Sequence, residues 1–397
     1  MNASGTRADD RPRGGLTALC LAVTINWGIL FYALPTAVTP IAADTGWSPT
    51  LITGIYSCGL VLSAVLGVPV GRLLDRTGPR ALMTGGALVG TAALLLAAWS
   101  PHVLVFTLAW LLAGAAQTAT LYPPAIAVIT RWYGAERVRP LTALTLFGAF
   151  ASTVFSPITA FLVEHLGWHG AFAALAGILL VTSVPLHWFF LNAHWTDAQA
   201  TTHRQTPADA RAHVRAIARR PRFVMLQAVM LLAGFTMTAV TINIIPLLLS
   251  RGMEYGLAAV VLGLVGAGQV IGRLLYPLLS FRGRPAARTI LVYGSGAACL
   301  WGLALTPGPL WLLIVLAIAA GAARGCDTLL RATAVSDRWG TRNFGALNGR
   351  FSMPLTIGAA LAPVAGPAIA GWVGGYALMA VVMAGGLTVA AVLAART

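Results

Sequence analysis

A succession of apolar segments, each long enough to cross a lipid bilayer, constrains this chain more than any other feature of its sequence. About 20 apolar residues in a helix span the ~30 Å hydrocarbon core. Of the 397 residues, 58% are hydrophobic and only 9% are charged, which leaves too little polar surface to cover a water-soluble fold. We therefore expect an all-α membrane protein with about 12 transmembrane helices. The predicted spans are about 16–41, 50–70, 81–99, 103–130, 140–163, 169–192, 222–250, 257–279, 288–306, 309–335, 343–368 and 373–395.

The placement of arginine predicts the orientation of the spans. Arginines cluster after the second, fourth, eighth and tenth spans, and the alternate loops hold almost none. Because positive charge in short loops stays on the cytoplasmic side, both termini are expected in the cytoplasm of a multi-pass protein of the cell (inner) membrane. The formal charge of +15 thus reflects topology rather than nucleic-acid binding. The predicted domains are a cytoplasmic tail over 1–15, a six-helix bundle over 16–192, a basic cytoplasmic linker over 193–221 and a second six-helix bundle over 222–397.

An internal repeat relates the two halves. Ala113–Ala116 (Ala-Gly-Ala-Ala) in the fourth span recurs as Ala320–Ala323 in the tenth, and Gly71–Leu74 (Gly-Arg-Leu-Leu) recurs as Gly272–Leu275. Ordered matches at a nearly constant shift indicate a duplication, hence two pseudo-symmetric six-helix bundles. Parallel halves of this kind suit alternating access around a site near the bilayer midplane.

The segment between the second and third spans resembles a known signature. Gly71-Arg72-Leu73-Leu74-Asp75-Arg76-Thr77-Gly78-Pro79-Arg80 is similar to the pattern G-x-L-x-D-R-x-G-x-[RK] of the major facilitator superfamily. The resemblance implies the major facilitator fold, transport of a small molecule, and a gating role for five residues: Gly71, Asp75, Arg76, Gly78 and Arg80. The alternative is a charged turn without a special role.

Buried charges in the second half suggest where a substrate binds. Charged side chains inside a span are costly and are functional candidates by default. Arg273 lies inside the eighth span with Gln269 one turn earlier on the same face, and an arginine there would bind a carboxylate. The alternative is an anchor at the cytoplasmic end, like Arg72 in the repeat. In the tenth span, Arg324 is a second candidate, and Asp327 is either a proton-coupling site or a structural partner of Arg324.

Within the superfamily, the chain most resembles the monocarboxylate and oxalate/formate porter branch. Tyr32-Ala33-Leu34-Pro35 is similar to that branch's Tyr-Ala-x-Pro pattern, and Arg273 falls where its substrate arginine would lie. The chain departs from the branch at Thr36, where several members have lysine, and at Gln269, where the branch has an acid. The resemblance thus implies a small organic anion as substrate but does not transfer proton coupling. The remaining candidate substrate-binding residues are polar groups inside spans: Asn26, Tyr32, Thr36, Gln117, Tyr122 and Asn243.

Other functions compete with this one. Drug efflux by proton antiport would use aromatic residues such as Trp27, Phe31 and Tyr122, but the Gly-Pro kink motif of those antiporters is degraded at Ser156-Pro157. Metalloid efflux through Cys58 and Cys326, and a non-transport sensor, are minor alternatives. No nucleotide-binding loop or catalytic arrangement stands out, so neither an enzyme nor a cofactor or metal is expected. The expected partners are a small-molecule substrate, the lipid bilayer and protons as candidate coupling ion, and the expected state is a monomer.

Overall fold

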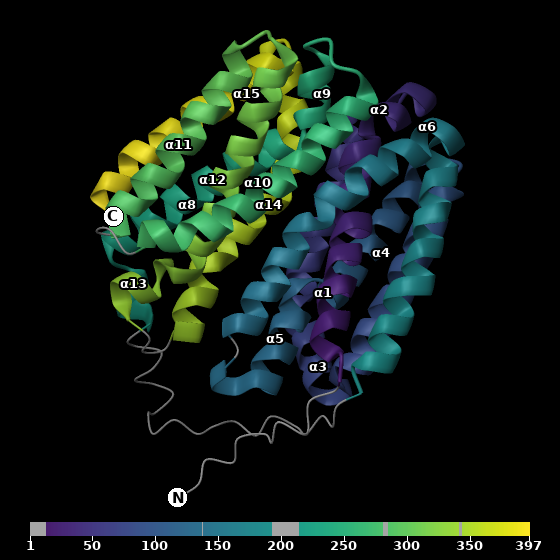
Figure 1. The fold of residues 1–397 in the computed structure, drawn as a ribbon, viewed down its shortest axis with the longest axis horizontal. Coiled ribbons are helices and arrows are strands. Elements are labelled where there is room, and N and C mark those ends of the chain that lie inside the picture. Colours follow the sequence, from purple (N-terminus) through teal and green to yellow (C-terminus); the bar gives the residue numbers. More distant parts are fainter. Residues whose placement is uncertain (1–12, 137, 193–213, 281–284, 341–343) are drawn as a thin grey trace, which may run out of the picture. The chain divides into compact units, whose positions relative to one another are not determined.

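The computed structural model describes residues 13–136, 138–192, 214–280, 285–340 and 344–397. The chain divides into two compact units, Met1–Gln199 (unit 1) and Ala200–Thr397 (unit 2), and each has its own set of packed helices. Residues 1–12 of the predicted tail and 193–213 of the predicted linker lie outside the described residues. Within the described ranges both units are helical, as Figure 1 shows.

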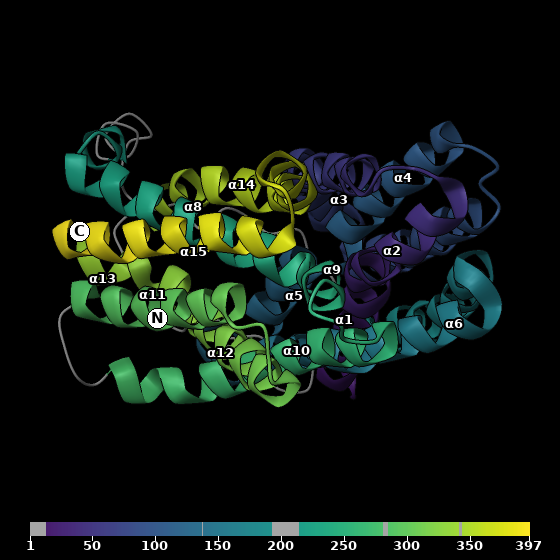
Figure 2. The same cartoon turned by 90° about the horizontal axis from the view of Figure 1, so that it is seen from above.

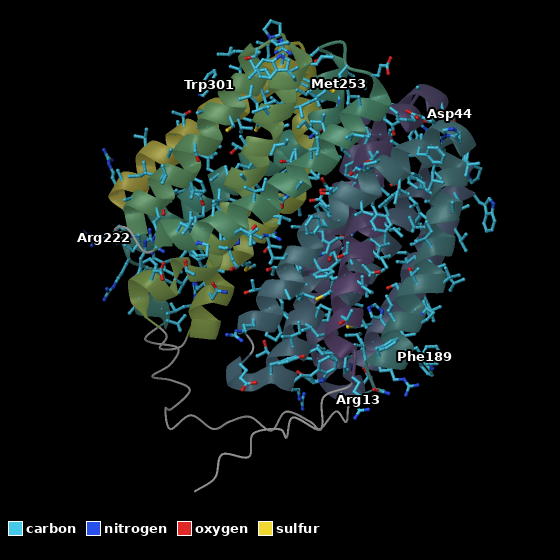
Figure 3. The ribbon with its side chains drawn as sticks, viewed as in Figure 1. Arg13, Asp44, Phe189, Arg222, Met253 and Trp301 are labelled. Carbon is cyan, nitrogen blue, oxygen red and sulfur yellow. The ribbon has the colours of Figure 1, made fainter. Side chains whose placement is uncertain are left out.

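The described residues of unit 1 form eight elements, and Figure 2 shows them from a second direction. They are α1 (Gly15–Asn26), the π-helical η2 (Trp27–Tyr32), α2 (Ala33–Thr45), α3 (Pro49–Ala98), α4 (Val103–Thr120), α5 (Tyr122–Tyr133), the 3₁₀ turn η3 (Gly134–Glu136) and α6 (Val138–Phe190). Figure 3 shows Asp44 at one end of this unit and Arg13 and Phe189 at the other.

Unit 2 carries a matching set of long helices with short segments between them. They are α8 (Pro221–Ile242), α9 (Ile244–Leu249), α10 (Tyr255–Ser280), α11 (Pro285–Leu305), α12 (Leu310–Ala334), α13 (Ser336–Trp339), α14 (Phe344–Val373), α15 (Tyr376–Leu393) and η4 (Ala394–Arg396). Arg222 lies at one end of this unit, and Met253 and Trp301 lie at the other (Figure 3).

The number of membrane crossings follows from the lengths of the helices. Over the described residues, 10 helices are long and apolar enough to cross a membrane. Two of them are far longer than one crossing needs: α3 has 50 residues and α6 has 53. Each is broken once, at Gly78 (φ 76°) and Gly167 (φ 67°), in a left-handed conformation that glycine adopts without strain. Counting α3 and α6 as two crossings each confirms the predicted all-helical transmembrane architecture of about twelve spans.

The internal repeat reappears as a repeated packing pattern. In unit 1, α4 packs on α3, and a side chain at Gly114 would overlap the carbonyl oxygen of Gly59. In unit 2, α12 packs on α10, and a side chain at Gly321 would overlap the carbonyl oxygen of Val265. Gly114 and Gly321 are the matching glycines of the duplicated Ala-Gly-Ala-Ala segments, so the repeat encodes the same backbone-to-backbone contact in both bundles.

Two further helix pairs of unit 1 have counterparts in unit 2. The α1–α6 contact of unit 1 corresponds to α8–α14 of unit 2, and the α3–α6 contact corresponds to α11–α15. Each bundle thus has the same internal arrangement of its helices, as a duplication predicts.

Candidate functional site

The close contact between α10 and α12 is the scaffold of the charged region in unit 2. A side chain at Gly272 would overlap the carbonyl oxygen of Ala322, and one at Gly325 would overlap that of Gln269. The thiol of Cys326 lies 3.1 Å from the carbonyl oxygen of Gly272, to which it donates. Small residues therefore bring the turn 269–273 of α10 directly beside the turn 322–326 of α12, where the predicted charged residues lie.

Arg273 and Gln269 are both buried in α10, with relative exposures of 8% and 6%. They are four residues apart and thus share one face of the helix. The repeat aligns Arg273 with Arg72, but Arg72 is exposed in α3. Burial therefore separates the two arginines of the repeat and argues against a simple anchoring role for Arg273, since burying a guanidinium requires compensating interactions.

Asp327 holds together three helices of unit 2. One carboxylate oxygen, Oδ1, accepts a hydrogen bond of 2.8 Å from the Tyr293 hydroxyl of α11. The other, Oδ2, forms an ion pair with Arg331 Nε at 2.8 Å, one turn along α12. Arg331 Nη2 in turn donates to the carbonyl oxygen of Met230 in α8, at 3.1 Å. We call Tyr293, Asp327 and Arg331 the carboxylate clamp.

The clamp bears on one alternative from the sequence, in which Arg324 at i−3 is the structural partner of Asp327. In the structure, Asp327 forms an ion pair with Arg331 at i+4. All three residues lie on one face of α12, so their spacing does not distinguish between the arginines. The sequence gives no sign of Tyr293, because no spacing rule links residues on different helices.

Arg324 is directed toward a different helix. It is partly exposed, and its Nη1 lies 3.5 Å from the carbonyl oxygen of Met237 in α8. Together, α10 and α12 contain three arginines and a single carboxylate: Arg273, Arg324, Arg331 and Asp327. The charge within these two helices is thus net positive, which favours an anion as ligand.

Asn243 lies where α8 gives way to α9. It is buried, and its side-chain amide donates to the carbonyl oxygen of Ala239 at 2.9 Å. Its amide also fills the space beside Gly366 of α14, where a larger residue would clash. The described contacts of Asn243 are therefore those of a residue that supports a helix break.

Two polar candidates of unit 1 are engaged inside the bundle. Asn26 is fully buried, accepts a 2.9 Å hydrogen bond from Ser183 Oγ, and lies 3.4 Å from the carbonyl oxygen of Thr120. Thr36, also fully buried, donates to the carbonyl oxygen of Tyr32 at 2.9 Å. The contacts of Asn26 join α1, α4 and α6, whereas the contact of Thr36 stays within the first span.

The Tyr-Ala-x-Pro segment has a clear structural effect. Proline has no N–H to donate, so Pro35 leaves one carbonyl group of the preceding turn without its helical donor. The chain is π-helical there, over Trp27–Tyr32. The Tyr56 hydroxyl donates to the carbonyl oxygen of Phe31 at 2.8 Å, and Gln117 Nε2 donates to that of Leu30 at 2.9 Å. Gln117 is a predicted substrate contact, and in the structure its amide supports this π-turn.

Three aromatic rings gather beside the π-turn. Trp27 lies with ring centroids 4.7 Å from Phe31 and 5.2 Å from Tyr122. All three residues are partly exposed, whereas the neighbouring Tyr32 is buried. We call Trp27, Phe31 and Tyr122 the aromatic cluster. Tyr122 reaches it because the helix of the fourth span breaks at Leu121 and restarts as α5.

The five predicted gating residues lie along α3. Asp75, Arg76 and Arg80 are exposed, and Gly78 forms the kink that turns the chain between two crossings. Arg80 lies over the ring of Trp188 in α6, 4.1 Å from its centroid. A cavity of about 210 Å³ is bordered by Gly71 and Asp75 of α3 and by residues of α4 and α5. The signature is thus largely helical, with the turn confined to Gly78.

A metal centre finds no support in the part of the chain that the structure describes. Three or more histidine, cysteine, aspartate or glutamate side chains do not come together there in an arrangement able to hold a metal ion.

The fold and the buried charges define a multi-pass helical membrane protein made of two pseudo-symmetric bundles. Comparison with known proteins identifies its family. Residues 19–311 match the Major Facilitator Superfamily, so the chain belongs to that superfamily. A solved bacterial homolog of the human lysosomal transporter Spinster, in an inward-facing and unoccupied conformation, has the same fold: its TM-score is 0.76 at 15% identity, over 99% of this chain and 98% of that one.

Relatives with closer sequences match only parts of the chain. Monocarboxylate transporter 13 of Bos taurus is 30% identical over 174 residues, which cover 43% of this chain and 37% of the relative. The uncharacterized MFS-type transporter YcxA of Bacillus subtilis (strain 168) is 26% identical over 234 residues, which cover 58% of this chain and 56% of the relative. The chain thus spans between about a third and somewhat over half of the length of these relatives.

Proposed function

We propose that this protein is a secondary transporter that moves a small, monocarboxylate-like organic anion across the cell (inner) membrane by alternating access. The observation that carries the proposal is the net positive charge of α10 and α12, in which Arg273 is buried, at 8% exposed, inside a membrane-spanning helix. A guanidinium in that setting pairs a carboxylate in a planar, two-point geometry. The family supports transport, and the name of the Bos taurus relative supports the same class of substrate.

The roles of individual residues form part of the proposal. Arg273 binds the carboxylate, with Gln269 beside it on the same helix face and Arg324 as a second positive group. The remaining predicted substrate contacts, such as Asn243 of unit 2 and Thr36 of unit 1, hold the helix geometry of their own units through the hydrogen bonds described above.

The topology and the gate belong to the proposal as well. Both termini lie in the cytoplasm, and the α3 segment from Gly71 to Arg80 acts as a cytoplasmic gate. Two six-helix bundles with equivalent internal packing support alternating access by a rocking mechanism.

Proton coupling through Asp327 requires that the carboxylate clamp opens. Both carboxylate oxygens are engaged, one by Tyr293 and the other by Arg331. A proton on Asp327 removes the charge that pairs with Arg331, so the clamp opens at its ion pair, whereas Tyr293 can keep its hydrogen bond by exchanging donor and acceptor roles. Protonation of Asp327 would therefore change the packing of α12 against α8 and α11. This link between a bound proton and helix packing provides a physical basis for proton-coupled transport.

Transport by the purified full-length protein in vesicles tests the proposal. We expect Arg273→Ala to abolish uptake of small monocarboxylates while the protein still inserts and purifies, and Arg273→Lys to retain part of it. Arg222→Ala removes an exposed arginine from the same unit and serves as the matched control (Figure 3). Uptake of a carboxylate that survives Arg273→Ala would exclude Arg273 as the anion site.

A ligand screen separates this function from drug efflux, the alternative that the aromatic cluster favours. Small organic acids are expected to raise the melting temperature of the purified protein in an Arg273-dependent manner. Stabilisation by lipophilic cations alone, independent of Arg273, would favour the efflux function instead.

A further inference from the structure

We propose that Arg324 is a positioning residue that holds the end of α8 and releases it when a substrate anion pairs with its guanidinium. The inference rests on the proposed function and deepens it, because it gives the second positive group of the site a task besides attracting an anion. It concerns unit 2 alone, and it names the break between α8 and α9 at Asn243 as the part that the bound anion frees.

The contact made by Arg324 has a counterpart in unit 1. Gln117 Nε2 donates to the carbonyl oxygen of Leu30 at 2.9 Å, and Arg324 Nη1 lies 3.5 Å from that of Met237. The two donors are 207 positions apart in the chain, and so are the two acceptors. The duplicated Ala-Gly-Ala-Ala segments have the same separation. The duplication therefore gave each bundle a side chain of one helix that supports an interrupted helix beside it.

A second contact beside each interruption is repeated at the same separation. Thr36 Oγ1 donates to the carbonyl oxygen of Tyr32, and Asn243 Nδ2 donates to that of Ala239, each at 2.9 Å and from four residues along the chain. These donors and acceptors are again 207 positions apart. The break between α8 and α9 is thus equivalent to the interruption at the π-turn, and differences between the two reflect the chemistry of each unit.

The interruption of unit 1 has a second donor. The Tyr56 hydroxyl donates to the carbonyl oxygen of Phe31 at 2.8 Å. In the close helix contact of unit 2, Val265 takes the place that Gly59 has in unit 1, so Leu262 takes the place of Tyr56. Leucine has no hydroxyl, so this second donor has no counterpart at the equivalent place in unit 2.

The helices that pack on the two interrupted spans differ as well. In unit 1, α1, η2 and α2 all pack on α6. In unit 2, α8 packs on α14 and α15, whereas α9 packs mainly on α10. Asn243 stands between α8 and α9 with φ −102° and ψ 20°, outside the α-helical range. The break in unit 2 therefore separates two segments with different partners, which is the arrangement of a hinge.

The charge of Arg324 makes its contact with Met237 responsive to an anion. A guanidinium pairs a carboxylate through two parallel hydrogen bonds and about twice as strongly as a neutral group. At 3.5 Å, the contact with the carbonyl oxygen is long and is readily exchanged for such a pair. The neutral amide of Gln117 has no comparable preference for an anion. An anion at Arg324 therefore draws the guanidinium away from Met237 and frees the end of α8.

Two substitutions of Arg324 distinguish this role from simpler ones. Arg324→Gln keeps the contact with α8, since Gln117 shows that glutamine reaches the equivalent carbonyl oxygen, but it removes the response to an anion. Arg324→Ala removes both. The full-length protein in vesicles is assayed for propionate transport above the rate of protein-free vesicles. We expect transport to be at least about 10-fold slower in Arg324→Gln than in the wild type, and faster in Arg324→Ala than in Arg324→Gln.

The order of the two variants decides between the roles. If Arg324 only attracted the anion, both variants would lose its charge and would be slowed equally. If it only stabilised the bundle, Arg324→Ala would be the slower variant, because it loses the contact that glutamine keeps. Either result would overturn the inference.

Amide hydrogen exchange at the end of α8, over residues 238–245, gives a direct measure of the release. In the wild type, propionate should speed this exchange by at least about 3-fold. Arg324→Gln should exchange slowly with or without propionate, and Arg324→Ala should exchange fast without it. Arg222→Ala, which removes an exposed arginine at the start of α8, is the control and should behave as the wild type. Wild-type exchange that propionate slows or leaves unchanged would overturn the inference, and this comparison needs no variant to fold.

Arg273→Ala separates failure of this inference from failure of the proposed function. Propionate transport that depends on Arg273, with equal rates in the two Arg324 variants, would refute the release of α8 and leave anion transport standing. No propionate transport by the wild type, together with faster amide exchange in Arg324→Ala than in Arg324→Gln, would refute anion transport and leave Arg324 as the residue that holds α8.

Discussion

Replacing Asp327 with asparagine tests the carboxylate clamp directly. The asparagine oxygen can still accept the hydrogen bond from Tyr293, but the 2.8 Å ion pair with Arg331 is lost. At that separation and an effective dielectric constant of about 20, the attraction is roughly 6 kcal/mol before desolvation is subtracted. Removing one partner of a buried ion pair costs about 3–5 kcal/mol, because the other charge stays buried. The Arg331 side chain is 23% exposed, which places the expected loss near the lower end, at about 3 kcal/mol.

Thermal unfolding of the purified protein, at one fixed scan rate, measures this loss. At about 2–4 °C per kcal/mol for a unit of this size, the melting temperature should fall by roughly 6–12 °C. The double variant Asp327→Asn/Arg331→Gln removes both charges and should recover most of the loss. Glu254→Gln, an exposed carboxylate of the same unit, is the control and should change stability by less than about 0.5 kcal/mol. An unchanged melting temperature in Asp327→Asn, or no recovery in the double variant, would refute the clamp.

Three further predictions concern coupling, helix packing and the π-turn. Vesicles that contain the Asp327→Asn variant should lose proton-driven accumulation of substrate and keep exchange of substrate across the membrane. Accumulation that survives under a pH gradient would exclude Asp327 as the coupling site. Gly321→Ala should destabilise the protein by about 1–3 kcal/mol, since the added methyl group meets the Val265 carbonyl oxygen. The control is Gly294→Ala, where the methyl group enters open space and should be neutral or stabilising. Equal melting temperatures for the two variants would contradict the backbone contact. Tyr56→Phe removes the hydrogen bond from Tyr56 to the Phe31 carbonyl oxygen and should lower the free energy of unfolding by about 1 kcal/mol. The loss is measured as a lowered melting temperature, and a wild-type melting temperature would show that the π-turn does not need this bond.

Much of the fold could be predicted from the sequence because the bilayer admits few solutions. Backbone groups in hydrocarbon must bond within their own segment, so apolar segments of spanning length become helices. The duplicated Ala-Gly-Ala-Ala segments also indicated the repeat, and Gly114 and Gly321 now show what it encodes. The two long helices, broken only at Gly78 and Gly167, could not be seen from hydropathy, since a single positive-φ glycine decides where the chain turns.

The candidate site was predictable in its composition but not in its pairing. Burial of Arg273 and the charge of α12 followed from their places within apolar segments, since any charge there is rare and costly. The sequence did not tell whether Asp327 pairs with Arg324 or Arg331, because both lie on the same helix face. It also gave no sign that Tyr293 supplies the hydrogen bond or that Gln117 supports the π-turn.

The sequence alone therefore determined the class of protein, the number of crossings and the positions of the buried charges, because each depends on local hydrophobicity and helical spacing. Only the tertiary structure decided which polar groups meet: the three-helix clamp at Asp327, the donors that satisfy the carbonyl groups before Pro35, and the contact of Trp27 with Tyr122 across two interrupted helices. Apart from the ion pair within α12, the hydrogen bonds among them join residues 25 to 101 positions apart in the chain. Such pairs meet only where the packing of the helices brings distant segments together, and local sequence carries no record of that approach.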